Sequence, residues 1–189
     1  MPLEHAILGF IEFEPISGYD LKKLFDVSIV HFWSATQSHI YKSLDGLEKK
    51  GWVSANIIQQ IGKPNRKVYQ ITEDGRAELR RWLVTPLPMD PVRESSLIQI
   101  FFSHFSTNEE IAALFETRMN AIREQIETLR TVAQVAIDEN AKRIGVERAR
   151  QLWQITLDYG MDYYEFELAW HEKMLNTIHN LPALTPPNM

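Results

Sequence analysis

Apolar residues in the N-terminal part of the chain recur at intervals of three and four. This spacing predicts a helix over residues 3–11, a second helix after Ser17 and a third from Thr36 to Gly51. Ser17 and Thr36 carry hydroxyl groups that can cap helix N-termini, and Gly51 suits the left-handed position that ends a helix. The third helix is expected to turn one apolar stripe toward the interior, made of Ile40, Leu44 and Leu47.

The pattern then changes to one typical of β-strands. Residues 52–58 are rich in strand-forming side chains, and Tyr69 and Ile71 alternate with polar residues in a second short strand. The turn 62–67 contains glycine, proline and asparagine, so we expect it to join the strands as a hairpin. Thr72 then predicts the cap of a fourth helix. The buried residues of that helix are expected to be Leu79, Trp82 and Leu83.

A proline-rich segment divides the chain. Pro86, Pro88 and Pro91 cannot continue a helix, and they predict a stiff linker. We therefore expect a mixed domain over 1–85, a linker over 86–92, a helical domain over 93–181 and a frayed tail over 182–189.

Everything between the linker and the tail is predicted to be helical. One helix is expected to begin at Asp90-Pro91, where an acidic cap precedes a first-turn proline. A second is expected to begin at Thr107, which forms a capping-box pattern with Glu110. The last is expected to run from about Val146 to His179.

The helix that begins at Thr107 carries apolar residues in alternating steps of four and three, the spacing of helices that pack along their length. The last helix has two apolar stripes and therefore needs two partners, one within the chain and one in a second copy. Burial against the first domain and the helix at Asp90 is the alternative. The predicted dimerisation residues are Phe115, Met119, Ile122, Ile126, Leu129, Tyr163, Phe166 and Trp170.

Composition limits the classes of function. The 189 residues include no cysteine, which excludes disulfides, thiolate metal sites and a cysteine nucleophile. The net charge of −5 argues against a nucleic-acid binder, but residues 42–81 hold 9 basic and 5 acidic side chains, a local charge of +4. Local field matters more than total charge for meeting phosphates.

Three helices followed by a hairpin is the order of a winged helix-turn-helix domain. The predicted fold is therefore mainly α, with an N-terminal winged helix-turn-helix that has a two-stranded wing and an all-helical C-terminal dimerisation domain. In such domains the third helix enters the major groove and the wing contacts the backbone or minor groove. The predicted DNA-binding residues are Gln37, Ser38, His39, Tyr41, Lys42, Lys49, Lys63, Arg66 and Lys67.

A winged-helix module that binds proteins without contacting DNA is the alternative function. Such a module has no need of basic side chains gathered on the third helix and the wing. The cluster therefore favours double-stranded DNA as the partner.

Residues 3–83 resemble the PadR family of transcriptional regulators. The second domain is similar to the longer branch that contains the AphA virulence-gene activator. The resemblance implies a cytoplasmic bacterial homodimer that binds a partly palindromic operator. The matching stretches are 18–21, 40–44, 47–51 and 62–72 with Gly75, and for the longer branch 28–29, 32–33 and 91–93.

Other chemistry finds little support. His171-Glu172 lacks the second histidine of an HExxH motif, and no glycine-rich phosphate loop is present, so no enzyme activity, metal or cofactor is predicted. No signal peptide and no apolar stretch long enough to span a membrane is expected. The aromatic residues between Trp153 and Trp170 predict that any effector is a small aromatic molecule, although such stripes more often form a packed core.

Overall fold

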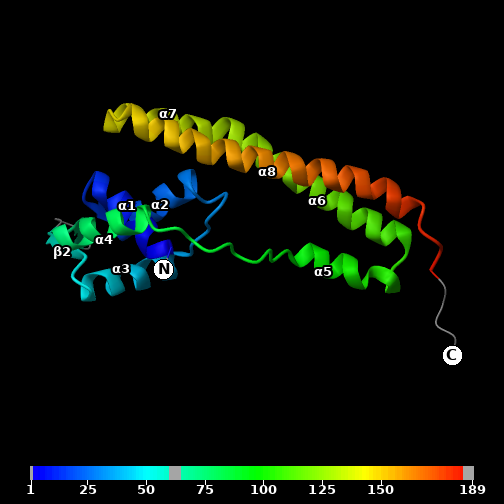
Figure 1. Cartoon of the computed structure of the whole chain (residues 1–189), viewed down its shortest axis with the longest axis horizontal. Coiled ribbons are helices and arrows are strands. Elements are labelled where there is room, and N and C mark those ends of the chain that lie inside the picture. Colours follow the sequence, from blue (N-terminus) through cyan, green and yellow to red (C-terminus); the bar gives the residue numbers. More distant parts are fainter. Residues whose placement is uncertain (1, 60–64, 185–189) are drawn as a thin grey trace. The chain divides into compact units, whose positions relative to one another are not determined.

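The computed structural model describes residues 2–59 and 65–184. The chain forms two compact units, Met1–Pro88 and Met89–Met189, which divide within the proline-rich segment. Figure 1 shows the first unit as short helices around a small sheet and the second as long helices lying side by side.

The first unit consists of four helices and three short strands. In chain order the elements are α1 (Pro2–Phe13), β1 (Ile16–Ser17), α2 (Gly18–Ser28), α3 (Gln37–Lys49), β2 (Val53–Ile58), β3 (Arg66–Ile71) and α4 (Glu73–Leu83). The sheet is antiparallel with the order β1-β3-β2, and Ala55 pairs with Tyr69 at its centre.

The three predicted N-caps of this unit and the predicted end of α3 are confirmed, whereas α1 extends to Phe13, two residues beyond its predicted end. The side chains of Ser17, Thr36 and Thr72 each accept a hydrogen bond from a backbone N–H in the first turn of the helix that follows. Gly51 has a φ of +71°, the left-handed conformation expected after α3. The core gathers the apolar faces of α1, α2 and α3 over the sheet, and Ile40, Leu44 and Leu47 are all fully buried within it.

Two details of this unit differ from the prediction. The wing hairpin gains a third strand, β1, because the segment entering α2 is extended and Ile16 pairs with Tyr69. This strand could not be predicted, because two residues are too few to show a period. Leu83, predicted to be buried, is 64% exposed because it lies in the last turn of α4, beyond Leu79, which packs into the core.

The second unit contains only helices. Its elements are α5 (Ser95–Phe102), a 3₁₀ turn η1 (Ser103–Phe105), α6 (Asn108–Thr128), a π-helical segment η2 (Leu129–Ala133), α7 (Gln134–Ile144) and α8 (Glu147–His179). Figure 1 shows α8 running alongside α6 and α7 over most of its length, and α6 and α8 are in extensive contact. The predicted capping box of Thr107 and Glu110 is present at the start of α6.

The first helix of this unit begins later than predicted. We expected it at Asp90-Pro91, but residues 90–94 are not helical and α5 begins at Ser95. Glu94 provides the cap, since its carboxylate accepts hydrogen bonds from the backbone N–H and the hydroxyl of Ser96. Proline at 91 therefore belongs to the extended linker and not to the first turn.

The residues of the heptad seam are covered within one chain. Phe115, Met119, Ile122, Ile126 and Leu129 are buried, and the ends of the seam pack against α8. These side chains are only 2–7% exposed, so the spacing of the seam reflects packing within the subunit. Of the remaining predicted dimerisation residues, Trp170 is half-buried against Phe115, whereas Tyr163 and Phe166 are exposed.

Candidate nucleic-acid interface

Helix α3 separates its apolar and polar residues onto opposite faces. The side chains of Ile40, Leu44 and Leu47 have no accessible surface and fix the helix against the core. Every residue predicted to contact DNA from this helix is exposed: Gln37, Ser38, His39, Tyr41, Lys42 and Lys49. The packing of one face therefore determines which side chains are presented on the other.

The two lysines predicted to bind DNA from α3 form no ion pair within the described residues. Within residues 2–59 and 65–184, neither Lys42 nor Lys49 has an acidic partner. Lys50, the next residue, is different because its ammonium group lies 2.8 Å from a carboxylate oxygen of Glu4 on α1. Lys42 and Lys49 are thus available for phosphate groups.

Arg66, the first residue of β3, is paired with an acidic residue of α2. Its guanidinium group forms an ion pair with the carboxylate of Asp20. The Ser17 hydroxyl donates a hydrogen bond of 2.5 Å to the same carboxylate. That hydrogen bond, together with the charge of Arg66, lowers the pKa of Asp20, so the carboxylate is ionised at neutral pH.

Lys67, the second residue of β3, is paired with α3. Its ammonium nitrogen lies 2.7 Å from an oxygen of Glu48 and 5.0 Å from the centre of the Tyr69 ring. The hydrogen bond to Glu48 raises the pKa of Lys67, which keeps the charge in place. Burial raises the pKa of Tyr69, so its hydroxyl stays protonated beside this pair.

A groove of about 650 Å³ lies between the start of α2, the exposed side of α3 and the base of the wing. Its wall is tightly packed where α2 meets α3, because a Cβ atom at Gly18 would lie 2.8 Å from the Tyr41 ring. The groove is lined by Ser17, Gly18, Tyr19, Asp20, Tyr41, Asp45, Asn65, Arg66, Lys67 and Tyr69. Three predicted DNA-binding residues thus meet in this groove: Tyr41 of α3, and Arg66 and Lys67 of β3.

Lys63, predicted at the wing tip, lies outside the described residues. The acidic partners of the wing, Asp20 and Glu48, were not predicted. They are separated from Arg66 and Lys67 by 46 and 19 residues, and no local pattern signals a pair formed over such a distance. Only the fold brings these charges together.

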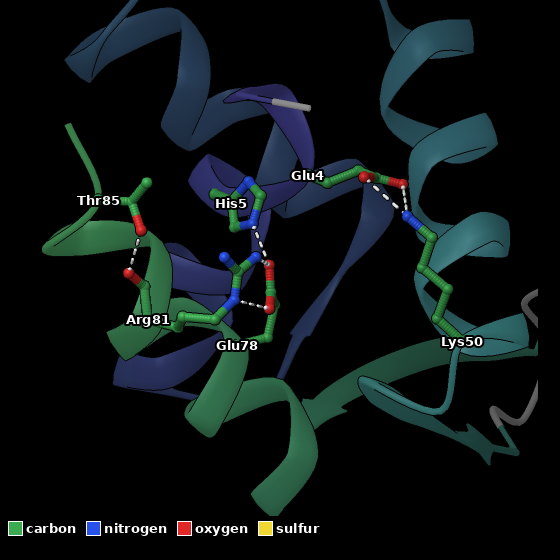
Figure 2. A network of polar contacts seen from close by, with 6 residues as sticks. All are labelled: Glu4, His5, Lys50, Glu78, Arg81 and Thr85. Carbon is green, nitrogen blue, oxygen red and sulfur yellow. Dashed lines mark hydrogen bonds and ion pairs between the residues drawn. The ribbon is translucent and has the colours of Figure 1, made fainter. Parts of the chain in front are cut away.

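A polar network behind α3 connects α1 with α3 and α4 (Figure 2). Nε2 of the buried His5 lies 2.9 Å from the Glu78 carboxylate, and the His5 ring stacks on Trp82 at 4.6 Å between ring centres. Arg81 donates two further hydrogen bonds to Glu78. On the other side of His5, Glu4 pairs with Lys50 at the end of α3. The network therefore anchors the helix that presents the candidate interface.

The described residues were also compared with the requirements of a metal site and of a membrane span. Among the described residues, no three histidine or acidic side chains are placed to hold a metal ion. His171 is buried, with Nδ1 2.7 Å from the main-chain oxygen of Glu167. None of the described helices combines the length and hydropathy needed to cross a lipid bilayer.

Comparison with known proteins gives matches along almost the whole chain. Residues 7–81 match the transcriptional regulator PadR-like family, and residues 92–179 match the virulence activator alpha C-terminal family. A probable transcriptional regulator of Mycobacterium tuberculosis, Rv1176c, is 33% identical, and the alignment covers 94% of this chain and 98% of the relative. The negative transcriptional regulator PadR of Bacillus subtilis is 30% identical, and the alignment covers 62% of this chain and 65% of that regulator.

Solved structures share the fold. Bacillus subtilis PadR in complex with operator DNA has a TM-score of 0.78 at 24% identity, covering 94% of this chain and 99% of that one. The same regulator in complex with p-coumaric acid has a TM-score of 0.70 at 23% identity, and the match covers 95% of this chain and 100% of that one. The Vibrio cholerae virulence activator AphA has a TM-score of 0.72 at 21% identity, and the match covers 94% of this chain and 98% of that one.

Proposed function

The chain belongs to the PadR-like family of transcriptional regulators, and from this premise we propose that it binds a partly palindromic operator as a homodimer. Helix α3 would enter the major groove, and the wing would lie along the flanking backbone. The protein would act in the cytoplasm, where bacterial chromosomes are found.

One observation carries this proposal: Tyr41 on the exposed face of α3 and the cations Arg66 and Lys67 of β3 line a common groove. Gln37, Ser38 and His39 stand in the first turn of α3, the part of a recognition helix that reaches base edges. Amide, hydroxyl and imidazole groups can read the donors and acceptors of the major groove. Lys42 and Lys49 would contact phosphates. Bacillus subtilis PadR, which shares this fold, forms a complex with operator DNA.

A protein-interaction module would use the same fold without DNA. It does not account for Lys42 and Lys49, which stand exposed without an acidic partner in the described part of the chain. Unneutralised cations on one helix face match the regularly spaced phosphates of a duplex. The charge of this face therefore favours DNA.

A homodimer is supported by the surface of α8. Tyr159, Tyr163 and Phe166 remain exposed on this helix after the seam is covered within the chain. Specific recognition by a single winged helix is weak, and two half-sites about 34 Å apart supply the contacts that one lacks. The exposed stripe is where a second copy would pack.

Control by a small aromatic effector is a further part of the proposal. Bacillus subtilis PadR forms a complex with p-coumaric acid, an aromatic acid. The aromatic residues between Trp153 and Trp170 on α8, where both tryptophans are half-buried and Tyr159 and Tyr163 are exposed, are where such a ligand would bind. Titration with a panel of aromatic acids, followed by tryptophan fluorescence, would detect saturable binding.

The DNA proposal is tested by selecting bound fragments from a genomic pool and titrating the recovered site by fluorescence anisotropy. Lys42→Ala and Lys49→Ala should each weaken binding to every duplex and flatten the log–log salt slope by about one unit. Gln37→Ala and His39→Ala should instead change the preferred sequence. Lys142→Ala, on α7 of the other unit, is the matched control. Recovery of no DNA, or parent-like binding by all four variants, would refute the assignment.

A further inference from the structure

The cations of the candidate interface fall into two groups. Lys42 and Lys49 on α3 are without acidic partners in the described part of the chain, whereas Arg66 and Lys67 on β3 are each matched by a carboxylate. At the base of the wing the two positive charges are cancelled by Asp20 and Glu48 before DNA arrives.

These two ion pairs have defined positions. Asp20 is held by the Ser17 hydroxyl, and its own backbone N–H donates back to that hydroxyl at 3.2 Å. The ammonium group of Lys67 is held over the Tyr69 ring, which is itself buried. Asp20 and the ammonium group of Lys67 are therefore held in place, and a phosphate that reaches Arg66 or Lys67 also meets a carboxylate.

All four side chains remain accessible to a ligand. The exposed fractions are 45% for Arg66, 37% for Asp20, 43% for Lys67 and 39% for Glu48. A phosphate can therefore compete for the cations, since ion pairs of this exposure are weak.

We propose that Asp20 and Glu48 weaken binding to DNA of any sequence by holding Arg66 and Lys67 in ion pairs that phosphates must displace or share. This inference rests on the proposed DNA-binding function. Every duplex presents the same phosphates, so the cost of exchange falls equally on all sequences. Only a site that also gives base contacts to α3 offsets it.

A purely structural role predicts the opposite result. If the pairs served only to hold β3 against α2 and α3, removing a carboxylate would loosen the wing and weaken binding to all DNA. The two roles are therefore separated by the direction of the change in affinity.

The experiment uses the full chain, an unrelated duplex of about 25 base pairs and the operator recovered by selection, with potassium chloride varied from about 50 to 200 mM. Glu48→Gln and Asp20→Asn are compared with Asp74→Asn, which makes the same change of charge at an exposed position of α4. Circular dichroism melting confirms that each variant is folded.

Glu48→Gln and Asp20→Asn should each bind the unrelated duplex about two- to fivefold more tightly than the parent. The salt slope should steepen by up to about one unit, because each freed cation releases a counterion. Because the cost of exchange is the same for every duplex, the affinity for the operator should rise by the same factor, and the ratio of operator to non-operator affinity should stay unchanged. In a Lys67→Gln background, Glu48→Gln should leave the slope unchanged.

Unchanged or weaker binding to the unrelated duplex by both variants would overturn this inference. If Lys42→Ala still loses affinity in that case, DNA binding through α3 stands and only the role of the carboxylates is lost. If the parent binds no duplex at all, the proposed function fails and this inference fails with it.

Discussion

At the scale of single residues, the first unit depends on a glycine that has no room for a side chain. A Cβ atom at Gly75 would lie 2.1 Å from the main-chain oxygen of Trp52. That oxygen already accepts a hydrogen bond from the backbone N–H of Thr72, and the Thr72 side chain caps α4. The first turn of α4 therefore lies directly against the turn between α3 and β2.

Gly75→Ala should destabilise the protein by roughly 1–3 kcal/mol, because the main chain at Trp52 or Gly75 must shift to admit one methyl group. Thermal melting followed by circular dichroism measures the change. Gly9→Ala is the matched control, since a Cβ atom there meets nothing within 4 Å and alanine favours the interior of α1. A melting temperature of Gly75→Ala equal to that of Gly9→Ala would contradict this packing.

At the scale of elements, α1 and α4 are joined by charge. Hydrogen bonds from Arg81 and His5 lower the pKa of Glu78 to about 2. A carboxyl with a lowered pKa stabilises the fold above its ordinary pKa, near 4.5, and this contribution is lost as the pH falls toward 2. The contact between α1 and α4 should therefore weaken over this acidic range.

Glu78→Gln should melt below the parent at pH 6, and the difference should shrink as the pH is lowered from 5 to 2, because the glutamine has no charge to lose. Melting temperatures across this range for both proteins provide the measurement. Glu73→Gln, at a carboxylate of the same helix that is 86% exposed, is the control and should follow the parent. A constant difference between parent and Glu78→Gln at every pH would contradict the assignment.

The same scale shows what a sequence can and cannot specify. Helix α3 was predictable because Thr36, the apolar stripe and Gly51 are local signals that the fold obeys. Strand β1 was not, since two residues carry no period and its pairing with β3 is set by the fold. The ion pairs of Arg66 and Lys67 are likewise products of distant segments meeting. Local periodicity thus indicated which faces are presented, but not which charges are neutralised.

At the scale of the whole molecule, the central question is what covers the exposed face of α8. The heptad seam of α6 indicated a partner helix, and that partner is α8 of the same chain. The spacing of a seam reports that a helix packs along its length, but it carries no information about whether the partner is in the same chain. The stripe left on α8 consists of Leu152, Ile155, Tyr159, Tyr163 and Phe166.

This stripe recurs at steps of three and four along a helix of 33 residues, as a surface that packs against another helix does. We predict that it forms the homodimer contact. Phe166→Glu, at a side chain 63% exposed, should leave the subunit folded but shift the protein to monomer at micromolar concentration. Ile126→Asp should instead unfold the helical unit, because it places a charge in the buried seam. Lys142→Glu on α7 serves as the control. Sedimentation velocity decides the matter: a parent protein that is already monomeric, or a Phe166→Glu variant that stays dimeric, would rule out this interface.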